Sequence, residues 1–142
     1  MRCLGIVIKK NEIWYAVVDG MKMNDALIYE TGKHHYRAES STLMMDFSNI
    51  FTELVTKYRP QKIVYKLSLD VTLQQIPYMH FPLGVLHLIC LQHGISVDSR
   101  SSKWITAGKR AKITKCQDYF SQQQLRPDEL AATLIAWYGL EE

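Results

Sequence analysis

The sequence has no apolar run long enough to cross a membrane. The longest apolar stretch, residues 81–90, is interrupted by a proline, a glycine and a histidine, and it is far shorter than the roughly 20 residues that span a bilayer. The N-terminus becomes charged at Lys9 and Lys10 and lacks the apolar core and cleavage site of a signal peptide. We therefore expect a cytoplasmic protein without a membrane partner.

Ligand and cofactor motifs are also missing. Cys3, Cys90 and Cys116 form an odd set without CxxC or Cys/His spacing, which argues against a zinc site or a disulfide framework. The five histidines show no ligand pattern, and no GxxxxGK[ST], GxGxxG or GxSxG sequence occurs. We therefore expect no bound metal, no cofactor and no nucleotide site of those kinds.

What remains is the composition of a folded domain. Of the 142 residues, 47% are hydrophobic and 22% are charged, which is typical of a globular chain. No repeat or low-complexity linker interrupts it, so we predict one domain over residues 1–142. The formal net charge of +3 permits a polyanionic partner without requiring one.

The N-terminal third has the pattern of an antiparallel meander. Residues 3–8 and 12–18 are apolar runs rich in β-branched and aromatic side chains, and residues 9–11 between them are polar. This pattern predicts two strands joined by a tight turn. Residues 26–29 can form a third strand, and a polar stretch follows at 31–39.

The rest of the chain alternates helical and strand patterns. Apolar residues at 3–4 spacing predict a first helix, and Arg59-Pro60 ends it before the next strand. The predicted elements are a helix at 43–58, a strand at 62–67, helices at about 83–92 and 127–138, a short strand at 95–97, and a helix in the second half of 106–120. The order β-β-β-α-β-α-β-α predicts an α/β fold with a mixed five-stranded sheet whose first three strands are antiparallel.

Short motifs along this pattern resemble a known nuclease family. Leu4-Gly5-Ile6-Val7 resembles the first strand of RuvC-type Holliday junction resolvases, where Leu-Gly-Ile-Asp carries a metal-binding aspartate. The strand at 62–67 and the last helix, which begins near Asp128-Glu129-Leu130-Ala131-Ala132, resemble the segments that carry the other acids. The resemblance implies an RNase H-like fold, and the chain is also similar to small uncharacterised bacterial proteins of this scheme.

The same resemblance implies that the nuclease site is degenerate. Val7 stands at the first acidic position, Lys66 stands at the second, and Asp128 alone keeps an acid. Two-metal cleavage needs several carboxylates around the ions, so this set predicts a pseudo-nuclease with Val7 and Lys66 on adjacent strands. Two alternatives stay open: Asp19, Asp70 or Glu129 rebuilds a metal site, or Asp128 and Glu129 only favour the helix dipole.

A basic segment free of acids precedes the last helix. Its cations can neutralise phosphates and an exposed tryptophan can stack on a base. The alternative is a solvated loop with the indole packed in the core. The candidate nucleic-acid-binding residues are Lys103, Trp104, Lys109, Arg110, Lys112 and Lys115.

Residues 74–82 contain aromatic, methionine and proline side chains that either form a partner-binding or homodimer surface or close the core. Three functional hypotheses therefore remain. The first is an inactive RuvC-like module that binds DNA or a nucleoprotein partner and acts in transcription regulation. The second is a protein-interaction or oligomerisation domain without nucleic-acid binding. The third is an active nuclease with a relocated metal site.

Overall fold

The computed structural model describes residues 1–107 and 109–141, and the side chains of Lys109 and Arg110 lie outside that description. The described residues form a five-stranded sheet in the order β3-β2-β1-β4-β5. β1 pairs antiparallel with β2 and parallel with β4, β2 pairs antiparallel with β3, and β4 pairs parallel with β5. The strands are β1 (Arg2–Lys9), β2 (Glu12–Asp19), β3 (Leu27–His35), β4 (Lys62–Leu67) and β5 (Ser96–Ser101).

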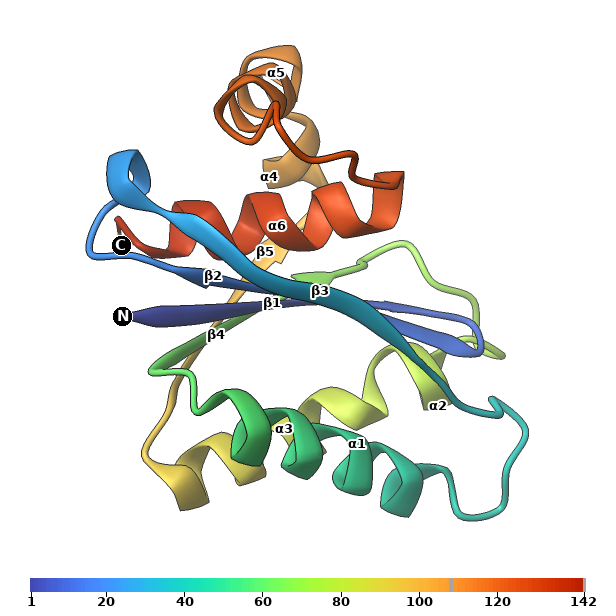
Figure 1. The fold of residues 1–142 in the computed structure, drawn as a ribbon. Coiled ribbons are helices and arrows are strands. Elements are labelled where there is room, and N and C mark those ends of the chain that lie inside the picture. The colour runs from blue at the N-terminus through green and yellow to red at the C-terminus, as the bar shows by residue number, and fades with distance from the viewer. Residues whose placement is uncertain (108, 142) are drawn as a thin grey trace.

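Helices cover both faces of this sheet (Figure 1). α1 and α3 form a layer on one face, α6 lies across the other face, and α4 and α5 lie beyond α6. The helical elements are η1 (Met23–Asp25), α1 (Leu43–Tyr58), α2 (Ile76–Met79), α3 (Phe81–His93), α4 (Ser102–Thr106), α5 (Lys109–Tyr119) and α6 (Pro127–Gly139). Within the described residues, no helix is both long and apolar enough to cross a membrane.

The central strand β1 is buried on both faces, which explains its unbroken apolar sequence. Leu4, Ile6 and Ile8 pack into the core between the sheet and the α1–α3 layer. Cys3 and Val7 pack into a second core beneath α6. Side chains alternate across a strand, so position in β1 decides which of the two cores a residue joins.

Helix α6 lies very close to the sheet because β1 has a glycine beneath it. A Cβ atom built on Gly5 would lie 2.0 Å from the backbone oxygen of Ala132. The other end of α6 is held by side chains: the Trp137 indole donates a hydrogen bond to the Met23 carbonyl at 2.7 Å, and the Lys62 ammonium donates one to the Gly139 carbonyl at 3.2 Å. These contacts fix where the N-terminus of α6 meets the sheet.

The two edge strands are longer than the sequence predicts. The third strand was expected at 26–29 but spans Leu27–His35, and the last was expected at 95–97 but spans Ser96–Ser101. An edge strand is partly solvated, so it accommodates polar residues that break an apolar run. The predicted helix at 43–58 is confirmed at both ends, and Gly94 ends α3 in the left-handed conformation with a φ of 67°.

The three cysteines are buried free thiols. Burial raises the pKa of Cys3 and of Cys116 to about 12 and that of Cys90 to about 11. Because the thiolate is the reactive form, all three thiols are inert in the folded protein. They serve as small apolar core residues, as their spacing in the sequence indicates.

Candidate nucleic-acid interface

The carboxyl ends of β1 and β4 lie side by side at one end of the sheet. The parallel register places Ile6 opposite Tyr65, so Val7 and Lys66 occupy the next positions on the two neighbouring strands. Both belong to the α6 face, because Val7 packs beneath α6 and Lys62, four residues before Lys66 on the same side of β4, reaches the α6 backbone. The two degenerate positions are therefore adjacent on one face.

The strand register extends these two positions into a row across the whole sheet. Val7 pairs with Trp14, Trp14 pairs with Lys33, and on the other side Lys66 pairs with Arg100. We call these five residues, Lys33, Trp14, Val7, Lys66 and Arg100, the cationic row. Three of its five members carry a positive charge, and the row lies on the face and at the end of the sheet where the resemblance places the acids of a nuclease.

The row presents positively charged side chains and lacks the oxygen ligands that a metal ion would need. Val7 is 2% exposed and has no ligand atom. The Lys33 ammonium lies 5.0 Å from the centroid of the Trp14 ring, a cation–π contact. The Lys66 ammonium has no ion-pair partner among the described residues, and its side chain is partly exposed. Lys66 is therefore the member of the row with a charge available to an anionic ligand.

The acids at this end of the sheet are already engaged. Asp128, at the start of α6, accepts a hydrogen bond from the Lys9 ammonium at 3.2 Å. Glu129 accepts one from the Thr31 hydroxyl at 2.7 Å and one from the Arg126 backbone N–H at 3.0 Å. The two carboxylates thus bind an ammonium, a hydroxyl and the helix N-terminus, which supports the interpretation that they stabilise that end of the helix.

A third acid, Glu12, pairs with a member of the row. Its carboxylate accepts hydrogen bonds from the Lys33 ammonium at 3.1 Å and from the Trp14 indole at 3.4 Å. The Lys33 hydrogen bond is the main cause that holds the pKa of Glu12 below its ordinary value. The stability that this pair contributes is present above the ordinary glutamate pKa and is lost as the pH falls through the lowered pKa.

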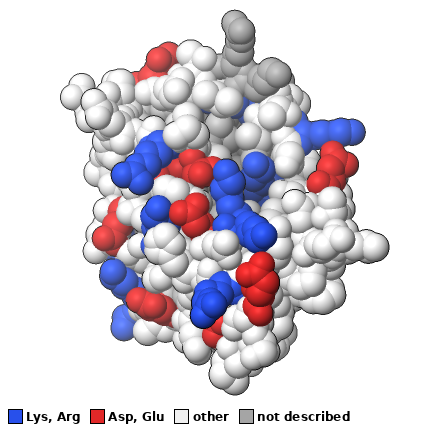
Figure 2. All heavy atoms as spheres, turned by 90° about the vertical axis from the view of Figure 1, so that its right-hand side faces the viewer, with Lys and Arg blue, Asp and Glu red and all other residues white. Residues whose placement is uncertain are grey.

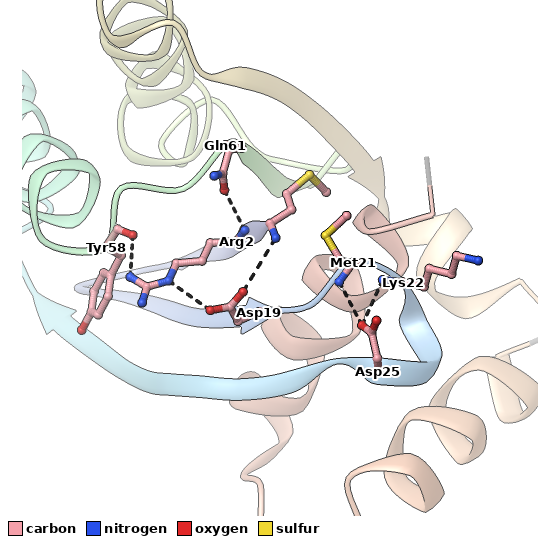
Figure 3. A network of polar contacts seen from close by, with 8 residues as sticks. Arg2, Asp19, Met21, Lys22, Asp25, Tyr58 and Gln61 are labelled. Atoms are coloured by element: carbon pink, nitrogen blue, oxygen red, sulfur yellow. Dashed lines mark hydrogen bonds and ion pairs between the residues drawn. The ribbon is translucent and has the colours of Figure 1, made fainter.

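The acids that might have rebuilt a metal site lie elsewhere. Asp19 pairs with Arg2 at the opposite end of β1, where its carboxylate accepts from the Arg2 guanidinium at 3.3 Å and lies 3.8 Å from the Met1 amino group (Figure 3). Asp70 is exposed in the loop after β4. Across the described residues, no three His, Cys, Asp or Glu side chains come together in a way that could hold a metal ion.

The surface at this end of the sheet carries charges of both signs. Figure 2 faces the end at which β1 and β4 finish, and it shows Lys and Arg side chains gathered in the middle with Asp and Glu beside them. The ion pairs Lys9–Asp128 and Lys33–Glu12 offset the mutual repulsion of these cations.

The basic segment is more closely tied to the fold than its sequence suggests. The Lys112 ammonium lies 3.8 Å from the centroid of the Trp104 ring and also donates to the Trp104 carbonyl. Tyr138 of α6 contacts the indole edge-on at 5.5 Å between ring centroids, and the Arg100 guanidinium lies 5.2 Å from the centroid of the same ring. Stacking of this ring on a base therefore requires Lys112 to move, and the geometry favours a packing role for Trp104.

The other members of the basic segment differ in their surroundings. Lys103 is exposed at the start of α4, and the Lys115 ammonium lies 5.9 Å from the ring centroid of Trp137. The side chains of Lys109 and Arg110 lie outside the described residues. Binding of nucleic acid by this segment stays a prediction.

Residues 74–82 are divided between the core and the surface. Tyr78 and Met79 pack against the core beneath the sheet, whereas Phe81 is 58% exposed. The stretch therefore closes the core at α2 and turns an aromatic side chain outward at the start of α3.

Sequence reasoning missed three cations that the fold brings to this end of the sheet: Lys9, Lys33 and Arg100. Each lies in a strand, but only the cross-strand register shows that they share a face with Lys66. In the sequence they are separated from Lys66 by more than 30 residues, and no local pattern joins them. A weak signal is present in the sequence, because Asp98 and Arg100 stand two residues apart, the spacing that places side chains on one face of a strand.

The order, pairing and layering of the elements define an RNase H-like fold of the RuvC type. In agreement with this class, the chain is similar to solved Holliday junction resolvases. Thermus thermophilus RuvC in complex with a Holliday junction substrate matches at 16% identity with a TM-score of 0.77, covering 96% of this chain and 90% of that one. The yeast mitochondrial Holliday junction resolvase matches at 11% identity with a TM-score of 0.73, covering 98% and 77%.

The fowlpox virus Holliday junction resolvase matches at 12% identity with a TM-score of 0.61, over 99% of this chain and 98% of that chain. No family model matches the sequence, and no curated protein matches it. At such low identities the structural likeness establishes the fold and leaves the activity to be argued from the site.

Proposed function

We propose that this protein is a catalytically inactive RuvC-like module that binds the phosphate backbone of DNA, alone or within a nucleoprotein complex that acts in transcription regulation. The cationic row is the observation that carries the proposal. A nuclease site of this fold collects carboxylates, and here a valine, two lysines and an arginine occupy or flank the corresponding strand positions. Lys9 lies two residues beyond Val7 on the same face of β1, and the Lys66 side chain is partly exposed.

The chemistry of these side chains argues against phosphodiester cleavage at this place. A divalent cation pair requires several oxygen ligands, and valine supplies none. An ammonium at the second position repels the metal. The remaining aspartate, Asp128, is paired with Lys9. These residues suit an anion rather than a metal ion. The anion that DNA presents to a protein is the phosphate group of its backbone.

A salt-dependent binding assay tests the proposal. The protein is titrated against four-way junction, duplex and single-stranded DNA from about 50 to 200 mM salt, and phosphate binding predicts a linear fall of the logarithm of affinity with the logarithm of salt. In the same tubes Mg²⁺ or Mn²⁺ is added, and the DNA is expected to remain intact. Absence of binding at low salt contradicts the DNA-binding proposal, and metal-dependent cutting contradicts inactivity.

Asp128→Asn is expected to tighten DNA binding, whereas in a metal-dependent nuclease the loss of an acid at this position would abolish cleavage. The substitution removes the ion pair to Lys9 and releases that ammonium for phosphate. We expect the affinity to rise several-fold and the salt slope to steepen by about one. The free energy of unfolding should change by less than about 1 kcal/mol, because the pair is partly exposed.

Glu53→Gln is the matched control for this change. It removes one negative charge from an exposed position on α1, in the layer on the other face of the sheet. We expect its DNA affinity to follow that of the unmodified protein. Weaker binding by Asp128→Asn would mean that the carboxylate itself contributes to the site.

Exposed apolar side chains favour a second function, binding of a protein partner. Leu88 and Leu91, three residues apart on α3, are 54% and 78% exposed, and large exposed apolar groups that lie together mark interaction surfaces. This function is compatible with DNA binding, because Leu91 lies on α3 and the cationic row lies on the other face of the sheet.

A further inference from the structure

The two edges of the sheet differ in how their outer backbone groups are bonded. At β5, the Ser99 N–H donates to the Asp98 carboxylate at 2.8 Å, and the Ser99 carbonyl accepts from the Arg100 guanidinium at 2.7 Å. These side chains occupy backbone groups that an added strand would need. β3 is the opposite edge (Figure 1), and within the described residues no side chain bonds to the backbone of its nine residues. Folded proteins usually shield a long edge strand, because its open N–H and C=O groups attract another strand.

The antiparallel pairing with β2 decides which residues of β3 turn their backbone outward. The Tyr36 N–H donates to the Asn11 carbonyl at 3.1 Å, just beyond the end of β3. Opposed residues of an antiparallel pair alternate between hydrogen-bonded and non-hydrogen-bonded positions. Counting back from Tyr36 along the register, Thr31, Lys33 and His35 are therefore the residues that turn N–H and C=O away from β2.

The side chains along this edge differ between the two ends of β3. At its start, where the pairing with β2 shifts register, Leu27 and Tyr29 are 71% and 56% exposed. The nearby Arg2 is paired with Asp19. Just beyond the other end, Arg37 is exposed, and its guanidinium has no ion-pair partner among the described residues. One end of the edge is thus apolar and the other is positively charged.

We propose that the outer edge of β3 binds an extended segment of a protein partner, which adds to the sheet as a sixth strand antiparallel to β3. Main-chain hydrogen bonds to the outward groups of β3 supply affinity in this mode of binding, and the flanking side chains supply specificity. In the antiparallel direction the segment begins beside Arg37 and ends beside Tyr29 and Leu27. The segment that fits is therefore acidic at its N-terminal end and apolar at its C-terminal end.

Charge favours such a segment over a second copy of β3. A second copy would bring another Lys33 to the same edge, and like charges on paired strands are destabilising. The single acid of β3, Glu30, already accepts a hydrogen bond from the Tyr58 hydroxyl on the α1 side of the sheet. A second β3 therefore has no free carboxylate to place beside Arg37, whereas an acidic segment does.

Binding of a synthetic peptide to the full chain tests the proposal. The probe has the length of β3, with glutamates at its N-terminal end, alternating threonine and valine in the middle and leucine at its C-terminal end. We expect saturable binding in fluorescence anisotropy with a micromolar dissociation constant. The matched control is the peptide of reversed sequence, which places its acids beside Leu27 and Tyr29, and it should bind at least about tenfold more weakly.

Methylation of the peptide's own amide nitrogens tests whether a strand is added. Only every second residue of an added strand donates its N–H to β3. One peptide is N-methylated at the odd positions of its middle part and another at the even positions. One of the two should lose at least about tenfold in affinity and the other should bind like the unmethylated probe. The protein is unaltered in this experiment, so its folding is not in question.

Thr31→Pro tests the edge from the protein side. The substitution removes an outward N–H, a position at which an edge strand accommodates proline, and the peptide affinity should fall at least about tenfold. Thr31→Val is the matched control. Both variants lose the hydroxyl that donates to Glu129, but valine keeps the backbone N–H and should bind the peptide like the parent. Urea unfolding of both variants shows whether each is folded.

Arg37→Glu tests the chemistry of the partner. It should weaken binding of the acidic probe and strengthen binding of a probe whose glutamates are replaced by lysines, because the charge beside the N-terminal end is reversed. A variant that kept the preference of the parent would overturn the assignment of an acidic segment to this end of β3.

Absence of saturable peptide binding, or equal binding by the two methylated peptides, would overturn the proposal. A chain that forms dimers in sedimentation equilibrium, and loses them in Thr31→Pro but not in Thr31→Val, would assign the edge to a second copy instead. Neither outcome touches the DNA-binding proposal, since Thr31 lies outside the cationic row and DNA affinity is measured separately.

Discussion

Gly5→Ala is expected to lower the free energy of unfolding by about 3 kcal/mol or more. The added methyl group would lie 2.0 Å from the Ala132 carbonyl oxygen and 3.1 Å from the Ala136 Cβ. The first of these atoms belongs to the backbone of α6, so the clash cannot be relieved by a side-chain rotation. Either α6 lifts from the sheet or β1 bends, and overpacking of this kind typically costs 1–3 kcal/mol and occasionally more. Urea unfolding followed by tryptophan fluorescence measures the loss.

Gly84→Ala is the control for the Gly5 substitution. A methyl group at Gly84 meets no atom within 4 Å, and alanine is favoured over glycine within a helix by roughly 1 kcal/mol. The control should therefore be unchanged or slightly more stable than the parent. A Gly5→Ala protein with unaltered stability would show that α6 does not rest directly on β1, and the placement of Asp128 over the sheet would then need revision.

Much of this fold can be predicted from local pattern. The helix at 43–58 was predictable because its buried residues recur every three to four positions. The paired strands at 3–8 and 12–18 were predictable because they are apolar runs on either side of a turn. The full lengths of the edge strands were not predictable, since Thr31 and Lys33 in β3 look like loop residues until the pairing with β2 is known. Helix α4 was missed because its five residues are too few to show a period.

Only part of the candidate site could be predicted from the sequence. Val7 and Lys66 were found because short motifs align them with acids of a known family, and the parallel pairing of β1 with β4 places them side by side. Lys33 and Arg100 could not be found, because cross-strand partners are set by tertiary structure. Trp104 had two interpretations from sequence, and its contacts with Lys112 and Tyr138 favour packing.

Lys66→Glu is expected to weaken DNA binding by roughly ten- to a hundredfold at low salt, which is the largest effect on binding that we predict for one residue. The change removes the ammonium without an ion-pair partner among the described residues and puts a carboxylate between Val7 and Arg100 in the cationic row. The salt slope should become shallower by about one, because one phosphate contact is lost. Stability should change little, since Lys66 lies near the end of β4 and is partly exposed.

Lys57→Glu is the matched control, because it makes the same change of charge at an exposed position on α1, in the layer on the other face of the sheet. Any effect of net charge alone should appear equally in both variants, so the difference between their affinities isolates the contribution of position. A carboxylate at position 66 also restores the charge of a nuclease acid, but Val7 beside it on β1 still offers no ligand atom, so Lys66→Glu should gain no Mg²⁺-dependent cleavage. Equal binding by the two variants would remove the cationic row as the DNA-binding surface and leave the basic segment around α4 and α5 as the remaining candidate.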